Sequence, residues 1–401
     1  MHYTEREWFA SGTARSYRAT GVGLSDDGRW SVAPEGSAAY TTRVVTLLPQ
    51  DQSSFSGTVV VEWLNVTTGS DAAPDLAYMS PELLRHGDAW IGVSVQQAGV
   101  DALKRSNPTR YDALHQPGDA FAWDLLSQVG RAVRTEPQLL DGLHPRLVLA
   151  AGESQSAFAL VTYVDGFALT EHVFDGYFIH SRGGGSMPLA GGLADAIAGQ
   201  THIRTDIDVP VLMLETETDE ATFGYFHARQ PDSQHVRLWD VAGGSHVDAY
   251  LLPPGYGAQL GCGIINAAPT HFAVAAALRA LDTWARTGTP PASAPRMDIA
   301  SGKTPTIERD ANGNAKGGIQ LPAIAVPTAA YSGIPPAGKG NTCIFFGSTT
   351  PFTKAQLKHL YPTHADYISK YTAATDSSIK AGYVLHDDRA AVLADATGKR
   401  W

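Results

Sequence analysis

The sequence predicts an α/β protein built on a mainly parallel, doubly wound sheet. Two observations support this fold class. Short apolar or β-branched runs alternate along the chain with segments of helical period, which is the pattern of a parallel sheet covered by helices. The chain is also long and apolar enough for a large core, with 401 residues of which 43% are hydrophobic and 17% are charged.

Composition and charge narrow the classes of partner. The formal net charge is −10 and no basic cluster occurs, which disfavours nucleic acid or an anionic membrane as a partner. No apolar run is long enough to span a membrane. The first residues lack a signal-peptide pattern, so we expect a soluble protein, either cytoplasmic or secreted with its signal removed. Nothing in the sequence indicates an oligomeric state.

The first third of the chain supplies strands and helices in alternation. Residues 1–36 are polar with only weak strand character. The elements expected next, in chain order, are a strand at 38–48, a strand at 58–64, a helix at 74–86, a strand at 89–95 and a helix at 119–134. In the last of these, Phe121, Leu125, Val129 and Val133 share one face.

The middle of the chain continues the same alternation. The expected elements are strands at 147–151, 174–179, 209–215 and 235–241, with helices at 157–164 and 270–286. The glycine-rich stretch 181–206, with one short helical piece, predicts a small lid. We therefore expect residues 1–286 to form the core domain.

The last part of the chain is expected to form an appendage, residues 287–401, packed on the core. Residues 287–340 are dominated by Gly, Pro and Ala and predict an extended arm on the surface, and a helical portion is expected at 354–375. The two cysteines, Cys262 and Cys343, fit neither a disulfide-rich scaffold nor a thiolate metal site. They form either one disulfide or two buried thiols.

The stretch from Arg146 to Phe158 carries the strongest chemical signal. Its apolar run ends in Gly152-Glu153-Ser154-Gln155-Ser156 and passes directly into a helical segment. In a nucleophile elbow the turn is so sharp that the residues two before and two after the nucleophile must be small, which Gly152 and Ser156 satisfy. Ser154 is therefore a candidate nucleophile. The alternative is an ordinary strand–turn–helix connection with Ser154 as helix N-cap.

A serine nucleophile needs a base, and the base needs an acid to orient it. The strand at 209–215 is followed by Glu217 and Asp219, and the strand at 235–241 is followed by a small-residue turn and His246. The order serine, acid, histidine, with each residue after a strand, is that of α/β-hydrolases. We expect His246 to be the base and Asp219 the acid, with Glu217 as the alternative acid.

The oxyanion of the tetrahedral intermediate requires N–H donors. We expect one from the backbone of Gln155 and another from the loop after the strand 58–64, at Val66 or Thr67. Weaker candidates for substrate binding are Asn65, Glu153, His180 and Arg182; for His180 and Arg182 a salt bridge beneath the lid is the alternative, and Glu153 is either simply buried or tunes the site. No clustered ligand pattern indicates a metal, and no cofactor is expected.

Several segments together resemble one family. These are VEWLNV (61–66), PGDAFAWD (117–124), GESQSA (152–157), TETD (216–219), AGGSH (242–246), DANGNAKGGIQLP (310–322) and FFGSTTPF (345–352). They are similar to the α/β-hydrolase domain family of largely uncharacterised bacterial and fungal proteins. The resemblance implies an α/β-hydrolase fold and a Ser-acid-His triad, but no particular substrate.

The expected activity is hydrolysis of a small or medium carboxylic ester through an acyl-enzyme. The alternatives are an amidase or peptidase with the same triad, a lyase on the same scaffold, and a non-catalytic binding protein.

Overall fold

A computed structural model describes residues 2–21, 23–192, 199–300, 306–336, 338 and 340–398. Its main sheet has eight strands in the order β1-β2-β4-β3-β5-β6-β7-β8. Their bounds are β1 (Tyr3–Ala19), β2 (Val32–Pro49), β3 (Thr58–Trp63), β4 (Ala89–Val93), β5 (Leu147–Glu153), β6 (Gly176–His180), β7 (Val211–Thr216) and β8 (Val236–Val241). The pairs β3–β4, β3–β5 and β5–β6 are parallel, and β1–β2 and β2–β4 are antiparallel. The expected mainly parallel sheet is confirmed.

The chain groups into two compact units. The first comprises residues 1–213, 227–237 and 281–291, and the second comprises residues 214–226, 238–280 and 292–401. Residues on both sides of position 286 contribute to each unit. The division into a core and an appendage at that position stays a prediction.

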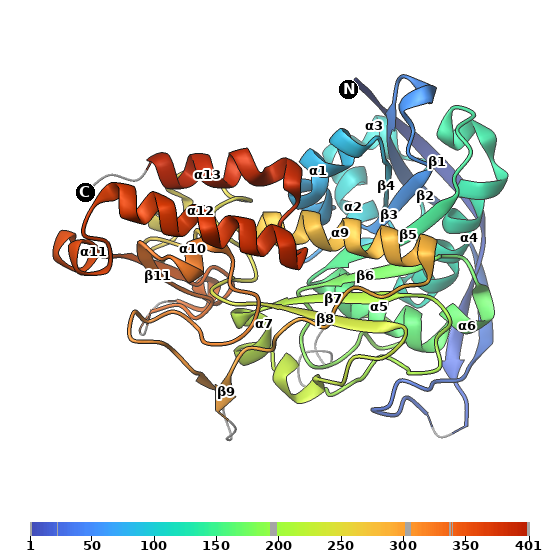
Figure 1. Cartoon of the computed structure of the whole chain (residues 1–401). Helices are drawn as coiled ribbons and strands as arrows, with labels where there is room; N and C mark the ends of the chain where they lie inside the picture. Colours follow the sequence, from blue (N-terminus) through green and yellow to red (C-terminus); the bar gives the residue numbers. More distant parts are fainter. Residues whose placement is uncertain are drawn as a thin grey trace. The chain divides into compact units, whose positions relative to one another are not determined.

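The centre of the first unit is a layer of parallel strands. Strands β3, β4, β5 and β6 lie side by side, and every one of their residues is buried (Figure 1). Such burial is typical of parallel strands covered on both faces, and it explains why these strands read as continuous apolar runs. The helices of this unit are α1 (Pro74–His86), α2 (Gln97–Ser106), α3 (Pro108–Tyr111), α4 (Ala122–Thr135), α5 (Gln155–Gly166) and α6 (Ala168–Glu171).

Helix α4 has the expected buried face. Leu125, Val129 and Val133 are each at most 2% exposed. Phe121 lies just before the helix, in a 3₁₀ turn (Asp119–Phe121), and is only partly buried. The predicted amphipathic face is therefore correct within the helix itself.

Strand β1 corrects the expectation for residues 1–36. This 17-residue strand pairs antiparallel with the 18-residue β2 along its whole length. It occupies the edge of the sheet, and most of its residues are at least partly exposed. A strand in that position does not need an apolar run, so its composition gave only a weak signal.

The second unit contains the other helices and two small sheets. They are α7 (Glu217–Ala221), α8 (Tyr256–Gln259), most of α9 (Thr270–Thr287), β9 (Ile299–Ala300), β10 (Thr306–Ile307), α10 (Pro322–Ala325), β11 (Ala329–Ser332), β12 (Ser348–Pro351), α11 (Lys354–Leu360), α12 (His364–Ala381) and α13 (Arg389–Gly398). Helices α12 and α13 pack side by side (Figure 1).

The segment 287–340 is more than a surface arm. Where it is described, it buries Met297, Ile319 and Leu321. The backbone of Ile319 donates to the carbonyl of Asp240 (2.7 Å) and accepts from Ala242 N–H (3.1 Å), so it bonds across the end of β8. Gly and Pro content alone did not reveal these contacts.

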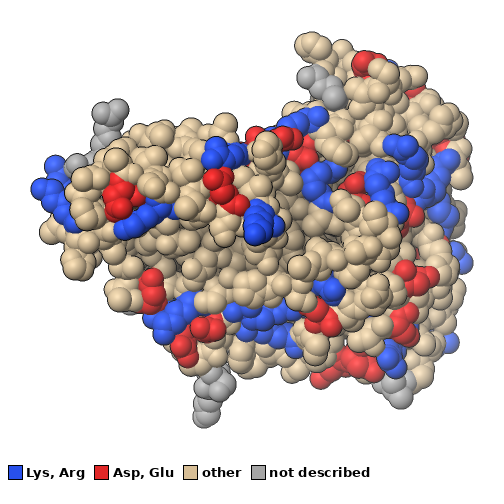
Figure 2. All heavy atoms as spheres, viewed as in Figure 1, with Lys and Arg blue, Asp and Glu red and all other residues tan. Residues whose placement is uncertain are grey.

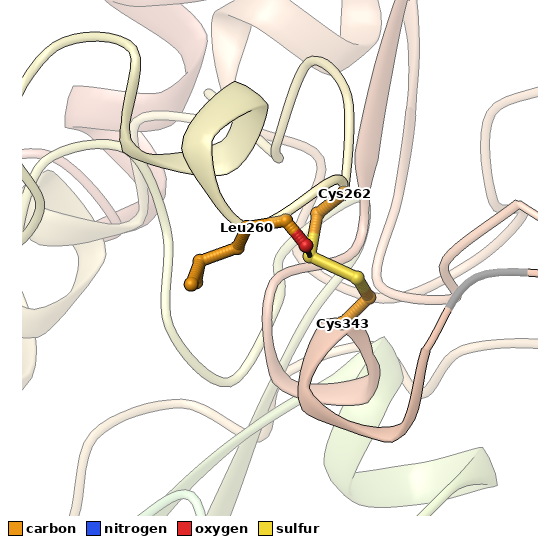
Figure 3. The surroundings of a disulfide bond; sticks show 3 residues. All are labelled: Leu260, Cys262 and Cys343. Atoms are coloured by element: carbon orange, nitrogen blue, oxygen red, sulfur yellow. Dashed lines mark hydrogen bonds between the residues drawn. A yellow bond between two sulfur atoms is a disulfide. The ribbon is translucent and has the colours of Figure 1, made fainter.

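The two cysteines form a disulfide. Cys262 and Cys343 are bonded, with their Cα atoms 5.4 Å apart, and the bond joins positions 81 residues apart in sequence (Figure 3). It lies in a buried cluster with Ile265 and Phe346. Of the two alternatives for these cysteines, the structure therefore has the bridge.

The described residues of the predicted lid pack tightly. Met187 donates its N–H to the carbonyl of Phe158 on α5 (3.0 Å), and the indole of Trp123 on α4 donates to the carbonyl of Leu189 (2.9 Å). Residues 193–198 of that stretch lie outside the described residues, and with them most of the helical piece expected there.

The helices and the charged side chains of the described residues can be compared with the expectation of neither a membrane nor a nucleic-acid partner. In the described part of the chain, no helix combines the length and apolar character that crossing a membrane requires. On the face that Figure 2 shows, Lys and Arg side chains are interspersed with Asp and Glu. The absence of a nucleic-acid or membrane partner stays a prediction.

Candidate active site

Ser154 lies at a sharp turn between β5 and α5. Its backbone has φ 59° and ψ −120°, outside the regions that L-residues usually adopt. The turn is held from both sides, because Ser154 N–H donates to the carbonyl of His180 on β6 (2.9 Å) and its own carbonyl accepts from Phe158 N–H (3.1 Å). Ser154 is partly exposed, whereas Glu153 and Gln155 are buried. Such strain at one residue is typical of a nucleophile elbow.

The small residues around Ser154 are required by close backbone approach. A Cβ atom on Gly152 would lie 2.9 Å from the carbonyl oxygen of Ser156 and 3.0 Å from its Cβ. Any side chain at position 152 would therefore force the turn open. Ser156 is fully buried at this contact, so a larger residue there would meet the same obstacle.

The predicted oxyanion donors lie around the start of α5. Gln155 is the first residue of this helix, and the first N–H groups of a helix have no intrahelical acceptor. Val66 N–H donates to the side-chain oxygen of Gln155 (3.1 Å), and Thr67 N–H donates to the side-chain oxygen of Asn65 (2.8 Å). Both predicted loop donors thus have a side-chain acceptor in this structure.

Asn65 ties the loop after β3 to the elbow. Its amide donates to the carbonyl of Glu153 (3.0 Å) and to the Glu153 carboxylate (3.3 Å). Its backbone pairs with Ala72 in both directions. These bonds give Asn65 and Glu153 a structural role in shaping the elbow, and substrate binding by either stays a prediction.

His180 and Arg182 are both buried and engaged with the protein. His180 Nδ1 is 2.8 Å from Asp75 Oδ1, and the two side chains are at most 1% exposed. Arg182 donates to the carbonyl of Thr201 (2.7 Å). Burial raises the pKa of Asp165 well above its ordinary value, and the charge of Arg182 acts in the opposite direction. His180 therefore faces a buried carboxylate, and Arg182 bonds to a backbone carbonyl. A role in substrate binding stays a prediction.

A buried acid pair, Glu62 on β3 and Asp75 on α1, was not predicted from the sequence. Glu62 on β3 accepts hydrogen bonds from the N–H groups of Asp75 (3.0 Å) and Leu76 (2.9 Å) and from the Trp90 indole (2.8 Å). Burial, and next the charge of Asp75, raise the pKa of Glu62 well above its ordinary value. Burial also raises the pKa of Asp75, while its bond to His180 acts in the opposite direction. The signal in the sequence was the single charged residue inside the apolar run TVVVEWL.

In the second unit, the turn after β7 holds Asp219 in a fixed position. Thr216 caps helix α7, and its N–H and hydroxyl both donate to Asp219 Oδ2 (2.8 and 2.6 Å). This is a capping box, which satisfies backbone groups at the helix start. The other oxygen, Oδ1, is 2.7 Å from His246 Nδ1. Asp219 is fully buried and His246 is 3% exposed.

Glu217, the alternative acid, is engaged elsewhere. Its Oε1 accepts from Gly243 N–H (2.9 Å), and its Oε2 accepts from Gly333 N–H (3.0 Å) and from Arg309 (2.7 Å). Burial raises the pKa of Glu217, while Arg309 and the backbone bonds act to lower it. The geometry therefore favours Asp219 as the partner of His246.

The loop that carries His246 is braced by distant segments. His246 N–H donates to Thr218 Oγ1 (3.2 Å), whose hydroxyl in turn donates to the carbonyl of Gly333 (2.7 Å). The His246 ring meets Phe223 edge to face at 4.8 Å between centroids and Phe345 at 5.7 Å. Phe223, Gly333 and Phe345 were not identified from the sequence as part of the site. The signal available for Phe345 was its place in the FFGSTTPF segment.

Over the described ranges, no group of three or more His, Cys, Asp or Glu side chains is arranged to hold a metal ion.

A mainly parallel sheet that presents a serine on a strained strand–helix turn, with a histidine bonded to an acid after later strands, defines the α/β-hydrolase class. The chain belongs to the alpha/beta hydrolase domain family, whose model matches residues 1–394. The reaction class that this membership supports is hydrolysis. The comparison with curated proteins gave no match.

Several solved structures are similar to this chain, and three of them, all hydrolases, are described here. An α/β serine hydrolase without a lid from Xanthomonas campestris is 13% identical, with 58% of this chain and 83% of that chain covered and a TM-score of 0.32. A dienelactone hydrolase from Anabaena variabilis is 15% identical, with 61% of this chain and 94% of that chain covered and a TM-score of 0.33. A fungal esterase from Rhizomucor miehei is 11% identical, with 63% of this chain and 81% of that chain covered and a TM-score of 0.33.

Proposed function

We propose that the protein is a serine hydrolase that cleaves carboxylic esters through an acyl-enzyme, with Ser154, Asp219 and His246 as its triad. The observation that carries the proposal is the strained backbone of Ser154 at the strand–helix turn. The buried 2.7 Å bond between His246 and Asp219 supports it independently, because a general base requires a partner that fixes its tautomer.

The proposed chemistry has two halves. Ser154 Oγ attacks the ester carbonyl while His246 Nε2 takes its proton, and the C–O bond to the alcohol then breaks as the alcohol receives that proton. Water next attacks the acyl-enzyme, His246 takes a proton from it, and the acid product leaves as Ser154 is reprotonated. In both halves Asp219 stabilises the imidazolium.

The oxyanion formed in each half needs donors fixed in advance. We propose the N–H of Gln155 at the start of α5 and the N–H of Val66 for this role. Val66 N–H becomes available when the Gln155 side chain releases it, because that side chain accepts it in this structure. Thr67 is the alternative donor, and its N–H is turned toward Asn65.

The proposed partner is a small or medium ester, and esters are favoured over amides because their alcohols leave more readily. An amidase or peptidase would use the same triad, and comparing turnover of matched anilides and esters separates the two.

We also propose maturation in an oxidising compartment, because disulfides persist there and are rare in the cytosol. Thiol alkylation with and without reductant, followed by mass spectrometry of protein from its native source, tests this.

The deciding experiment is pre-steady-state hydrolysis of p-nitrophenyl esters from acetate to octanoate, with the ester in excess over the protein. We expect a burst of p-nitrophenol from the wild type and none from Ser154→Ala, since removing a triad serine abolishes most of an about 10⁶-fold contribution. Ser156→Ala is the matched control, because Ser156 lies two residues from Ser154 and is fully buried. This variant should keep the burst. If a fluorophosphonate labels Ser154 but no ester turns over, the ester assignment is wrong. If Ser154 is not labelled either, the triad is wrong.

A further inference from the structure

The His246 ring sits in an aromatic setting within the second unit. Phe223 meets it edge to face at 4.8 Å and 82°, and Phe345 meets it at 5.7 Å and 44°. Phe223 and Phe345 also contact each other, at 5.6 Å. Asp219 fixes one ring nitrogen, and the two phenyl rings limit the tilt that a single hydrogen bond leaves open. The imidazole is therefore oriented by three neighbours.

The segment that contains Phe345 contacts both sequence neighbours of His246. Its carbonyl accepts from Val247 N–H (2.9 Å), the residue directly after the histidine. Gly347, two residues after Phe345, packs so closely that a Cβ there would lie 3.0 Å from Cβ of Ser245, the residue directly before the histidine. The segment 343–347 thus follows the path of the His246 loop.

This segment has little regular structure of its own. It contains the end of a single 3₁₀ turn (Asn341–Phe345), and such short turns have poor hydrogen-bond geometry and persist mainly through tertiary contacts. The covalent contact is the disulfide at Cys343, two residues before Phe345, which joins the turn to Cys262 (Figure 3). Val247 and Phe345 both pack against the buried cluster around that disulfide.

We propose that the Cys262–Cys343 disulfide holds Phe345 against His246, and that Phe345 is a positioning residue for the general base. This inference rests on the proposed function. Breaking the disulfide releases the turn, Phe345 withdraws from the imidazole, and His246 rotates away from the direction in which it takes the proton of the nucleophile. Because Phe345 acts through the orientation of His246, we expect the effect to fall on kcat and not on KM.

The test measures kcat and KM for a p-nitrophenyl ester with the oxidised protein, with the protein reduced by a phosphine, and with Phe345→Leu. We expect reduction and Phe345→Leu each to lower kcat about tenfold or more while KM changes less than about twofold, since small misplacements of a catalytic group have effects of this size. Phe345→Tyr, which keeps the ring, should restore most of kcat. Phe346→Leu is the matched control, because Phe346 packs in the same cluster against Tyr256.

The outcomes separate this inference from the proposed function. If the oxidised wild type neither turns over an ester nor reacts with a fluorophosphonate, the proposed function fails. If it is active and the reduced protein, still folded by circular dichroism, keeps its kcat, the disulfide has no positioning role. If reduction unfolds the protein, Phe345→Leu with the disulfide intact decides: a kcat equal to that of Phe346→Leu overturns the proposal.

Discussion

Gly333 offers a sharp test of whether the distant segment 306–335 shapes the site. A Cβ atom at this position would lie 2.5 Å from the carbonyl oxygen of Gly244 and 2.6 Å from both Glu217 Cβ and Thr218 N. None of these atoms is the end of a flexible side chain, so Gly333→Ala requires the backbone to move. Its φ is not among the positive values of the chain, so the expected cost is steric and not conformational.

The magnitude follows from what surrounds Gly333. Overpacking of a buried site costs about 1–3 kcal/mol, and weakening the bond between Gly333 N–H and the Glu217 carboxylate adds about 1.5–3 kcal/mol. We therefore expect the free energy of unfolding to fall by about 2.5–6 kcal/mol. Thr218, which bonds to both Gly333 and His246, is displaced with α7, so kcat should fall at least about tenfold.

The assay combines urea denaturation with turnover of a p-nitrophenyl ester. Gly340→Ala is the control, because Gly340 has φ −63° and a Cβ there meets nothing within 4 Å. It should change neither stability nor kcat. If Gly333→Ala unfolds at the same urea concentration as the wild type and keeps its kcat, the close packing of this segment on the His246 loop is wrong.

Three further predictions concern single contacts. Gln155→Ala removes the acceptor of Val66 N–H. Because a hydrogen bond worth about 1 kcal/mol no longer has to be broken, we expect kcat for ester hydrolysis to rise about fivefold. A fall in kcat would show that the Gln155 side chain itself takes part in the reaction. Burial raises the pKa of Glu62, so its stabilisation is complete below the ordinary value of 4.5 and is lost as pH rises through the folded value. As pH rises from 4.5, urea unfolding should show the wild type losing stability relative to Glu62→Gln. If the difference between their free energies of unfolding does not change with pH, the prediction is wrong. Replacing Cys262 and Cys343 by Ala should lower the free energy of unfolding by about 4–5 kcal/mol for a bond spanning 81 residues, and calorimetry showing less than about 1 kcal/mol would refute the estimate.

The sequence predicted the strands that are buried on both faces and missed β1, which is mostly exposed. Strands β3 and β5 read as apolar runs because helices cover both of their faces, whereas β1 lies at the sheet edge and leaves most positions at least partly exposed. The elbow was also predictable, since the close approach of Gly152 and Ser156 is a local property of five residues.

The choice of acid and the surroundings of His246 depend on contacts that no local pattern encodes. Glu217 and Asp219 stand two residues apart on one short helix, and only their bonding partners distinguish them. Two residues that brace the His246 loop, Gly333 and Phe345, lie about 90 and 100 residues further along the chain. Spacing along the sequence carries no information about such pairs, so they emerged only from the structure.

The bracing of the His246 loop by residues near 333 and 345 sets an order of events during synthesis. About 190 residues separate Ser154 from Phe345, which takes about 10–40 s at ordinary translation rates. During that interval the elbow can form, but the loop that carries His246 lacks its supports. The nascent chain therefore passes through a period in which Ser154 has been made and the loop that carries His246 does not yet have the contacts from residues 333 and 345.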